Sequence, residues 1–107
     1  LVADLRGYGG SSKPAAAHAY HLDELVGDVR GLVRALGCDA CVLLGHDFGG
    51  ALAWQTAMQA PGLVRGLLLC NAPHPAAFQH ALLGDWRQRL RSWYMALFCA
   101  PRLPEAL

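Results

Sequence analysis

Hydrophobic positions along the first two thirds of the chain follow two different patterns. From Leu22 to Leu36 apolar residues recur every three or four positions, which predicts an amphipathic helix with one buried face. Acidic residues stand in its first turn, Arg34 stands in its last, and Gly37 follows, as is typical of the two ends of a helix. Residues 41–44 are instead uniformly apolar, as in parallel strands that are buried on both faces, and residues 63–70 predict another buried strand.

The remaining elements of the first part complete an alternation of strands and helices. A second helix is predicted from about Gly49 to Ala60, ended by Pro61, and residues 1–3 are expected to be the end of a further strand. The order strand, loop, helix, strand, helix, strand predicts an α/β fold with a parallel sheet and crossover helices.

The pattern changes after residue 73. Residues 76–98 predict one or two helices with aromatic side chains, and no further strand-like run follows. We therefore expect two parts, a sheet-containing core over residues 1–73 and a linker with the start of a separate helical layer over residues 74–107.

Composition narrows the classes of function. The chain has 107 residues, of which 54% are hydrophobic, so it is expected to form a globular core. Its formal net charge is only +1, which gives no electrostatic reason to expect nucleic acid as a partner. No run of about 18 apolar residues could span a membrane, and no secretory signal is present. Because the chain begins with Leu, we expect it to be a piece of a longer protein.

The sequence predicts neither a metal site nor a bound cofactor. Cys38 and Cys41 have the spacing of a metal or redox pair, but no second pair and no nearby histidine completes a ligand set. The segment 7–9 lacks the third glycine of a dinucleotide fingerprint, and there is no Gly-Lys-Ser/Thr. We expect all four cysteines to be small buried residues in a reducing compartment. They are Cys38, Cys41, Cys70 and Cys99.

The segment that says most about chemistry places Asp47 between a predicted strand and a predicted helix. Glycines at positions 45, 49 and 50 allow a sharp turn and a close approach of strand and helix. The apex residue of such an elbow is held at the carboxyl edge of the sheet, where open α/β folds bind ligands. Most hydrolases with this elbow have Ser at the apex. An Asp carboxylate is already ionised at neutral pH and suits displacement at a saturated carbon, which forms an alkyl ester. The other reading of Asp47 is a carboxylate that only caps the helix.

Three motifs together resemble epoxide hydrolases of the α/β-hydrolase fold, and most of all the vertebrate branch that has an N-terminal membrane anchor. In chain order they are Asp4-Leu5-Arg6-Gly7-Tyr8-Gly9-x-Ser11, Gly45-His46-Asp47-Phe48-Gly49-Gly50 and Asn71-x-Pro73-His74-Pro75. The resemblance implies that residues 1–73 are the central part of the hydrolase core with its nucleophile elbow. It implies that residues 74–107 begin a helical cap.

The same resemblance implies an activity and its partners. It implies a cofactor-independent hydrolase that converts a small apolar epoxide and water into a vicinal diol. It also implies a protein at the endoplasmic reticulum membrane or in the cytoplasm, not secreted, with any membrane anchor before residue 1.

Three residues match functional positions of that family. Asp47 matches the nucleophile that opens the ring and becomes an ester. The backbone N–H of Phe48 matches one donor of the oxyanion hole, which stabilises charge during hydrolysis of the ester. Tyr94, in Ser92-Trp93-Tyr94-Met95, matches a cap tyrosine that hydrogen-bonds the epoxide oxygen and protonates it.

The departures from the family pattern leave two alternatives open. Family members usually have Trp where this chain has Phe48, and haloalkane dehalogenases use that indole N–H to hold the departing halide. Phe48 therefore favours an epoxide over a haloalkane, although a dehalogenase-like hydrolase stays an alternative. The family's His-Gly-x-Pro segment would precede residue 1, and its catalytic histidine, the acid partner of that histidine and a second tyrosine would follow residue 107. The chain alone is thus expected not to turn over, and a truncated or decayed non-catalytic product is the other alternative.

The remaining polar candidates are expected to have structural roles. His46 is expected to point into the core, and His74 lies in the linker between two prolines. Asp4 is expected to accept backbone N–H bonds within its own loop. Three further histidines are expected at the surface, namely His18, His21 and His80.

Overall fold

The chain divides into two compact units, Leu1–Pro73 and His74–Leu107. The computed structural model describes residues 1–99 of it. The division falls at the residue where the hydrophobic pattern of the sequence changes. The assignment of the two units to a hydrolase core and a cap stays a prediction, and each unit is described by itself below.

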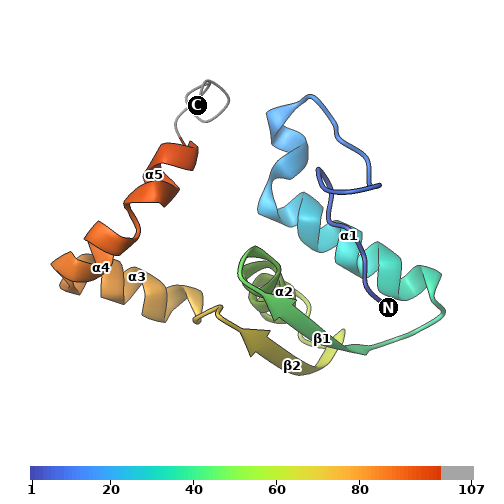
Figure 1. Ribbon diagram of the computed structural model, residues 1–107. Helices are drawn as coiled ribbons and strands as arrows, with labels where there is room; N and C mark the ends of the chain where they lie inside the picture. Colours follow the sequence, from blue (N-terminus) through green and yellow to red (C-terminus); the bar gives the residue numbers. More distant parts are fainter. Residues whose placement is uncertain (100–107) are drawn as a thin grey trace. The chain divides into compact units, whose positions relative to one another are not determined.

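The first unit is built around two parallel strands. Its elements are the 3₁₀ helix η1 (Ala17–Tyr20), α1 (Leu22–Ala35), β1 (Cys41–His46), α2 (Phe48–Gln59) and β2 (Val64–Cys70). β1 and β2 lie side by side (Figure 1). Leu44 lies opposite Leu68, and His46 lies opposite Cys70. α2 packs against both strands, and α1 packs against α2. The predicted order of helix, strand, helix and strand over residues 22–70, with parallel strands, is confirmed.

The core lies between α1 and α2. It contains the apolar face of α1 that the sequence predicted to be buried. Leu25, Val26 and Leu52 form a buried cluster, against which Leu5 and Val29 pack. Each buried aliphatic side chain of this kind contributes about 1.5–3 kcal/mol through removal of apolar surface from water.

The predicted end of α1 is also observed. Gly37 has a φ of +71°, and its N–H donates to the carbonyl of Arg34 at 2.9 Å. The N–H of Cys38 donates to the carbonyl of Val33 at 3.1 Å. These two bonds form a Schellman motif, which satisfies the last carbonyls of the helix and for which glycine is preferred.

The prediction that both strands are buried on both faces is wrong for one face of the sheet. Val42 is 61% exposed, Leu44 71% and Leu68 56%. These side chains alternate with those that face α2, and no other element of the first unit covers them. A continuous apolar run does not say which elements will pack on its two faces.

The cysteines and the first residues also differ from the expectation. Cys38 and Cys70 are exposed and Cys41 is half-buried, because Cys38 follows the end of α1 and Cys70 ends β2. The side chain of Cys99 lies outside the described residues. Residues 1–3 are not a strand, since no described strand pairs with them, and Leu1 is 87% exposed.

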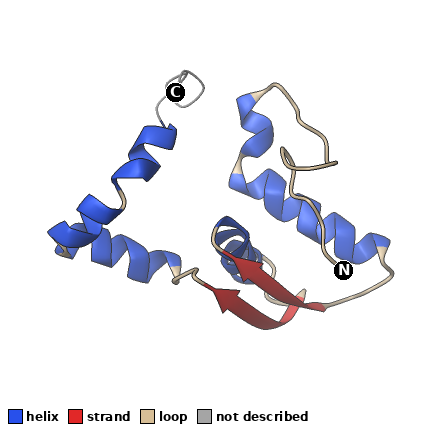
Figure 2. Cartoon of the chain, viewed as in Figure 1, coloured by secondary structure: helices blue, strands red, loops and turns tan. Residues whose placement is uncertain are grey.

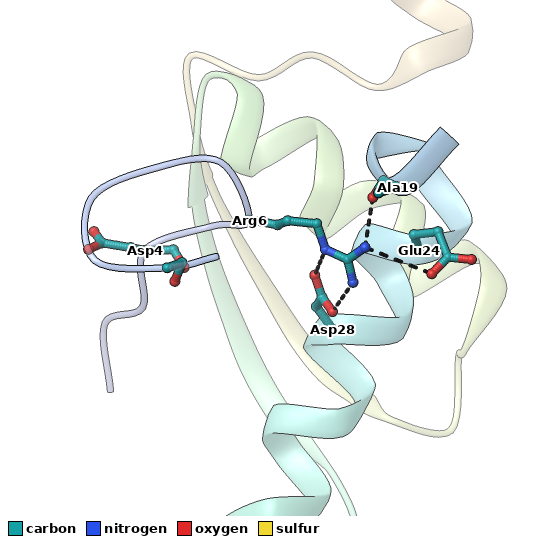
Figure 3. A network of polar contacts seen from close by, with 6 residues as sticks. Asp4, Arg6, Ala19, Glu24 and Asp28 are labelled. Carbon is teal, nitrogen blue, oxygen red and sulfur yellow. Dashed lines mark hydrogen bonds and ion pairs between the residues drawn. The ribbon is translucent and has the colours of Figure 1, made fainter. Parts of the chain in front are cut away.

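The glycine-rich loop after residue 3, on which Figure 3 labels Asp4, is held together from within by this residue. The carboxylate of Asp4 accepts a hydrogen bond from the N–H of Gly10 at 2.9 Å. The backbone carbonyl of Asp4 accepts another from the hydroxyl of Ser11 at 2.7 Å. A Cβ on Gly9, whose φ is +46°, would collide with the same carboxylate. The predicted loop-structuring role of Asp4 is confirmed.

Arg6 fastens this loop to α1 (Figure 3). Its Nε and Nη2 donate to the two carboxylate oxygens of Asp28 at 2.9 and 2.6 Å, and its Nη1 donates to the carbonyl of Ala19 at 2.8 Å. Glu24 lies 3.9 Å from Nη1. The hydrogen bond to Asp28 and the nearby negative charges raise the pKa of Arg6 above its ordinary value. The guanidinium is therefore cationic throughout the working range of pH.

The described part of the second unit, residues 74–99, consists of short helices (Figure 2). They are α3 (Pro75–Gly84), α4 (Trp86–Arg91) and α5 (Trp93–Cys99), where the sequence predicted one or two. Asp85 interrupts the helical run because its carboxylate accepts from the N–H of Arg87 at 2.8 Å and so begins α4. Within the described residues, neither unit has a helix of the length and apolarity that a membrane span requires.

Candidate active site

Asp47 stands at the apex of a sharp turn between β1 and α2. Its φ of 50° and ψ of −118° lie in a region that residues other than glycine rarely adopt. Such a conformation costs about 1–3 kcal/mol and persists only where the surroundings enforce it. The N–H of Asp47 donates to the carbonyl of Cys70 at 3.2 Å, and its carbonyl accepts from Ala51 at 3.0 Å.

Two glycines make this turn possible. A Cβ on Gly45 would lie 2.6 Å from the carbonyl oxygen of Gly49, and a Cβ on Gly50 would collide with the methyl group of Ala72. At Gly49, by contrast, a Cβ would meet no atom within 4 Å. The predicted need for glycine therefore holds at positions 45 and 50, and it is wrong for Gly49, which points to open space.

The carboxylate of Asp47 is exposed and does not cap the helix that it precedes. In the described part of the chain its side chain makes no capping hydrogen bond to α2, whereas His74 and Asp85 cap α3 and α4. The capping interpretation of Asp47 is therefore not supported. An exposed carboxylate at the end of a strand, in a strained backbone, is available to react with a small molecule.

Phe48 begins α2, directly after Asp47. The first amides of a helix have no acceptor within the helix, so the N–H of Phe48 is a candidate donor to a developing negative charge. Phe48 as a residue is 48% exposed. Asp47 and Phe48 thus share one turn. Tyr94 lies in α5 of the second unit and is 48% exposed, and its participation in the same site stays a prediction.

The predicted orientation of His46 is wrong. His46 is exposed, because it continues the alternation of β1 on the face that carries Val42 and Leu44. Its Nε2 lies 3.4 Å from the side-chain nitrogen of Asn71. His74 has a structural role, since its Nδ1 accepts from the N–H of Ala76 at 3.2 Å.

The three remaining histidines are exposed, as predicted. They are His18, His21 and His80. Among the described residues, no group of three or more His, Cys, Asp or Glu side chains could hold a metal ion.

Two residues beside the turn were not identified from the sequence. Asn71 follows β2 with a φ of 51°, a conformation that Asn tolerates better than most residues. Trp54 in α2 donates its indole N–H to the carbonyl of Ala72 at 3.2 Å. For Asn71 the sequence offered one signal, its place in a motif next to a predicted strand end. For Trp54 it offered none.

A cleft in the first unit lies away from Asp47. It has a volume of about 300 Å³ and lies between the glycine-rich loop and α1, where Arg6, Leu25 and Asp28 contribute to its walls. Arg6 and Asp28 already satisfy each other there. We therefore locate the candidate site by the chemistry of Asp47 and not by this cleft.

Comparison with protein families decides the class of the chain. The family model described as the alpha/beta hydrolase fold matches residues 1–97. The chain belongs to the alpha/beta hydrolase fold family. This confirms the predicted fold class, and the parallel strands with their connecting helix are the part of that fold seen here.

Individual members of the alpha/beta hydrolase family sharpen the resemblance. Epoxide hydrolase 1 of Caenorhabditis elegans is 41% identical over 107 residues, which is 100% of this chain and 26% of that protein. Epoxide hydrolase 3 of Xenopus tropicalis is 44% identical over 107 residues, which is 100% of this chain and 29% of that protein. The Bacillus megaterium epoxide hydrolase crystallised with an inhibitor matches with a TM-score of 0.90 and 36% identity, covering 96% of this chain and 36% of that one. The predicted resemblance to epoxide hydrolases is confirmed, and the chain spans less than a third of the length of these curated relatives.

Proposed function

We propose that the whole protein containing this chain is an epoxide hydrolase that works through an alkyl ester at Asp47. The observation that carries the proposal is the exposed, non-capping carboxylate of Asp47 at the apex of a strained strand-to-helix turn. The sequence identity of 41–44% to epoxide hydrolases, in alignments that cover all 107 residues, supports the reaction class.

The first step is ring opening. A carboxylate oxygen of Asp47 attacks one epoxide carbon and forms a C–O bond, while the bond from that carbon to the ring oxygen breaks. The electron pair goes to the ring oxygen, which takes a proton from the hydroxyl of Tyr94. A proton donor is needed here because an alkoxide is a poor leaving group. The products are a hydroxyalkyl ester of Asp47 and the tyrosinate.

The second step is hydrolysis of the ester. Water attacks the ester carbonyl, and the N–H of Phe48 stabilises the negative charge that develops on the carbonyl oxygen. The bond between the carbonyl carbon and the diol oxygen then breaks, so that the diol leaves and the carboxylate of Asp47 is restored. Of the two protons of the water, one goes to the leaving diol oxygen and the other returns to the tyrosinate of Tyr94. A general base must activate the water, and the family resemblance places that histidine beyond residue 107. Residues 1–107 alone are therefore expected to form the ester at most once and to release no diol.

The substrate class and the location follow from the same proposal. We infer a small apolar epoxide as substrate and no cofactor. A location at the endoplasmic reticulum membrane or in the cytoplasm stays a prediction from the resemblance.

The test is diol formation by the whole protein with styrene oxide as the probe, followed by chromatography. Wild type should form phenylethanediol, and Asp47→Asn should not. Asp85→Asn is the matched control, because it makes the same chemical change at an aspartate whose capping role Asn also fulfils. Diol formation by Asp47→Asn at the wild-type rate would refute the proposal.

The non-catalytic alternative has a separate test. Sequencing the transcript on both sides of this segment shows whether a histidine and an acidic residue follow in frame. Their presence supports the enzyme, and a stop codon directly after the segment supports a truncated product.

A further inference from the structure

We propose that Asn71 and Trp54 are positioning residues that hold Asp47 in its reactive geometry. They act through a brace, which we define as the three consecutive residues Cys70, Asn71 and Ala72 after β2. The inference rests on the proposed function of Asp47 and adds two residues to it.

Each residue of the brace contacts a different part of the turn. The carbonyl of Cys70 accepts from the N–H of Asp47 at 3.2 Å, which holds the apex. The side-chain nitrogen of Asn71 lies 3.4 Å from Nε2 of His46, the residue before the apex. The carbonyl of Ala72 accepts from the indole N–H of Trp54 at 3.2 Å, which holds the helix after the apex.

Backbone conformation couples these contacts. Asn71 has a φ of 51°, which bends the chain away from the direction of β2. The methyl group of Ala72 then occupies the space in front of Gly50, where any other residue would carry a Cβ. The brace thus lies directly against the backbone of α2 two residues after Phe48.

The turn needs support of this kind. The backbone of Asp47 is in a sparsely populated conformation, and such conformations persist only when the surrounding structure enforces them. The segment 45–50 cannot hold the backbone of Asp47 in this conformation alone, because half of its residues are glycines and glycine leaves the backbone free. The brace supplies this support from the neighbouring strand.

The consequence concerns the rate of ester formation. The attacking carboxylate oxygen must lie in line with the breaking C–O bond of the epoxide. A displacement of about 1 Å in a reacting group can lower a rate by about 100-fold. Loss of the brace should therefore slow alkylation, while it changes the affinity for the epoxide little.

Two substitutions remove the side-chain contacts with little other change. Trp54→Phe keeps an aromatic ring and removes the indole donor. Asn71→Gly removes the amide and keeps a residue that accepts a positive φ. Val26→Ala is the control, because Val26 is 1% exposed in the core between α1 and α2 and lies outside the brace.

The experiment is single-turnover alkylation of the whole protein by styrene oxide over a range of concentrations, with rapid acid quench and intact-mass detection. Trp54→Phe and Asn71→Gly should each lower the maximal alkylation rate about tenfold. The half-saturating epoxide concentration should stay within about twofold of wild type, as uniform binding is unchanged. Val26→Ala should lower the unfolding midpoint and leave the maximal rate unchanged.

The outcomes separate the inference from the proposed function. If wild type forms no ester at Asp47, the proposed function fails, and this inference fails with it. If wild type forms the ester and Trp54→Phe alkylates at the wild-type rate, only the positioning role is overturned. The fraction of unfolded protein is measured for each variant, including Val26→Ala. If the rate losses of Trp54→Phe and Asn71→Gly are no larger than their unfolded fractions explain, the positioning role is also overturned. Should Asn71→Gly not fold, Trp54→Phe alone decides.

Discussion

The methyl group of Ala72 occupies the place where Gly50 would carry a side chain. The segment after β2 therefore approaches helix α2 so closely that no side chain fits between Ala72 and the backbone of Gly50. This contact lies directly beside the turn that presents Asp47. The contact joins residues that are 22 positions apart and come from the two ends of one crossover.

Gly50→Ala should destabilise the protein, and Gly49→Ala should not. The added methyl at position 50 has no space, and overpacking of this kind costs about 1–3 kcal/mol. At position 49 a Cβ meets nothing within 4 Å, and Ala in a helix gains about 0.5–1 kcal/mol over Gly. Urea unfolding of the whole protein measures both. Equal stability of the two variants would contradict the close approach.

Arg6→Lys should loosen the glycine-rich loop without changing α1. Lys cannot make the paired hydrogen bonds with which Arg6 holds Asp28, so cleavage within residues 4–13 by a protease should become faster. Asp28→Asn should have the same effect. Equal cleavage rates in wild type and both variants would show that another contact holds the loop.

The pH dependence of the same contact has a definite sign. The hydrogen bond to Asp28 raises the pKa of Arg6 in the folded protein above its ordinary value. The contribution of this contact to stability is therefore fully present at any pH below the ordinary pKa of arginine, and it is lost only as pH rises through the higher pKa of the folded state. Loop cleavage in the wild type should therefore not accelerate between about pH 7 and about pH 10. A steep rise in that interval, with a protease whose own activity is corrected for, would contradict the assignment.

Tyr94→Phe should slow ring opening and leave the fold intact. Removal of a general acid typically costs about 10²–10⁴-fold in rate. Single-turnover alkylation measures this step, with Tyr8→Phe in the glycine-rich loop as a control for the loss of an exposed hydroxyl. An unchanged alkylation rate in Tyr94→Phe would remove Tyr94 from the mechanism.

The protein should not release halide from a haloalkane. Phe48 has no ring N–H with which to hold a departing halide, and its backbone N–H is expected to serve the ester carbonyl. Incubation of the whole protein with 1,2-dibromoethane and detection of bromide tests this. Bromide release at a rate comparable to diol formation from styrene oxide would favour the dehalogenase alternative.

The elements of the first unit could be predicted from the sequence because their signals are local. The spacing of apolar residues in α1 and the glycine after it depend only on nearby positions, and both are observed. The turn at Asp47 was predictable for the same reason, since the glycines that it needs are its neighbours.

Contacts that depend on strand pairing could not be predicted in this way. His46 meets Asn71 only because β1 and β2 pair in parallel with His46 opposite Cys70. The exposure of Leu44 depends on which face of the sheet α2 covers, and the apolar run itself carries no such information.

The most direct test of the account is to locate the covalent intermediate. The whole protein is mixed with styrene oxide in a single turnover, quenched in acid within milliseconds and digested, and the peptides are analysed by mass spectrometry. We predict that the peptide containing Asp47 gains the mass of one epoxide, with fragment ions that place it on the carboxylate of Asp47, and that Asp47→Asn shows no such adduct. An adduct on another residue, or diol formed without any adduct, would contradict the account.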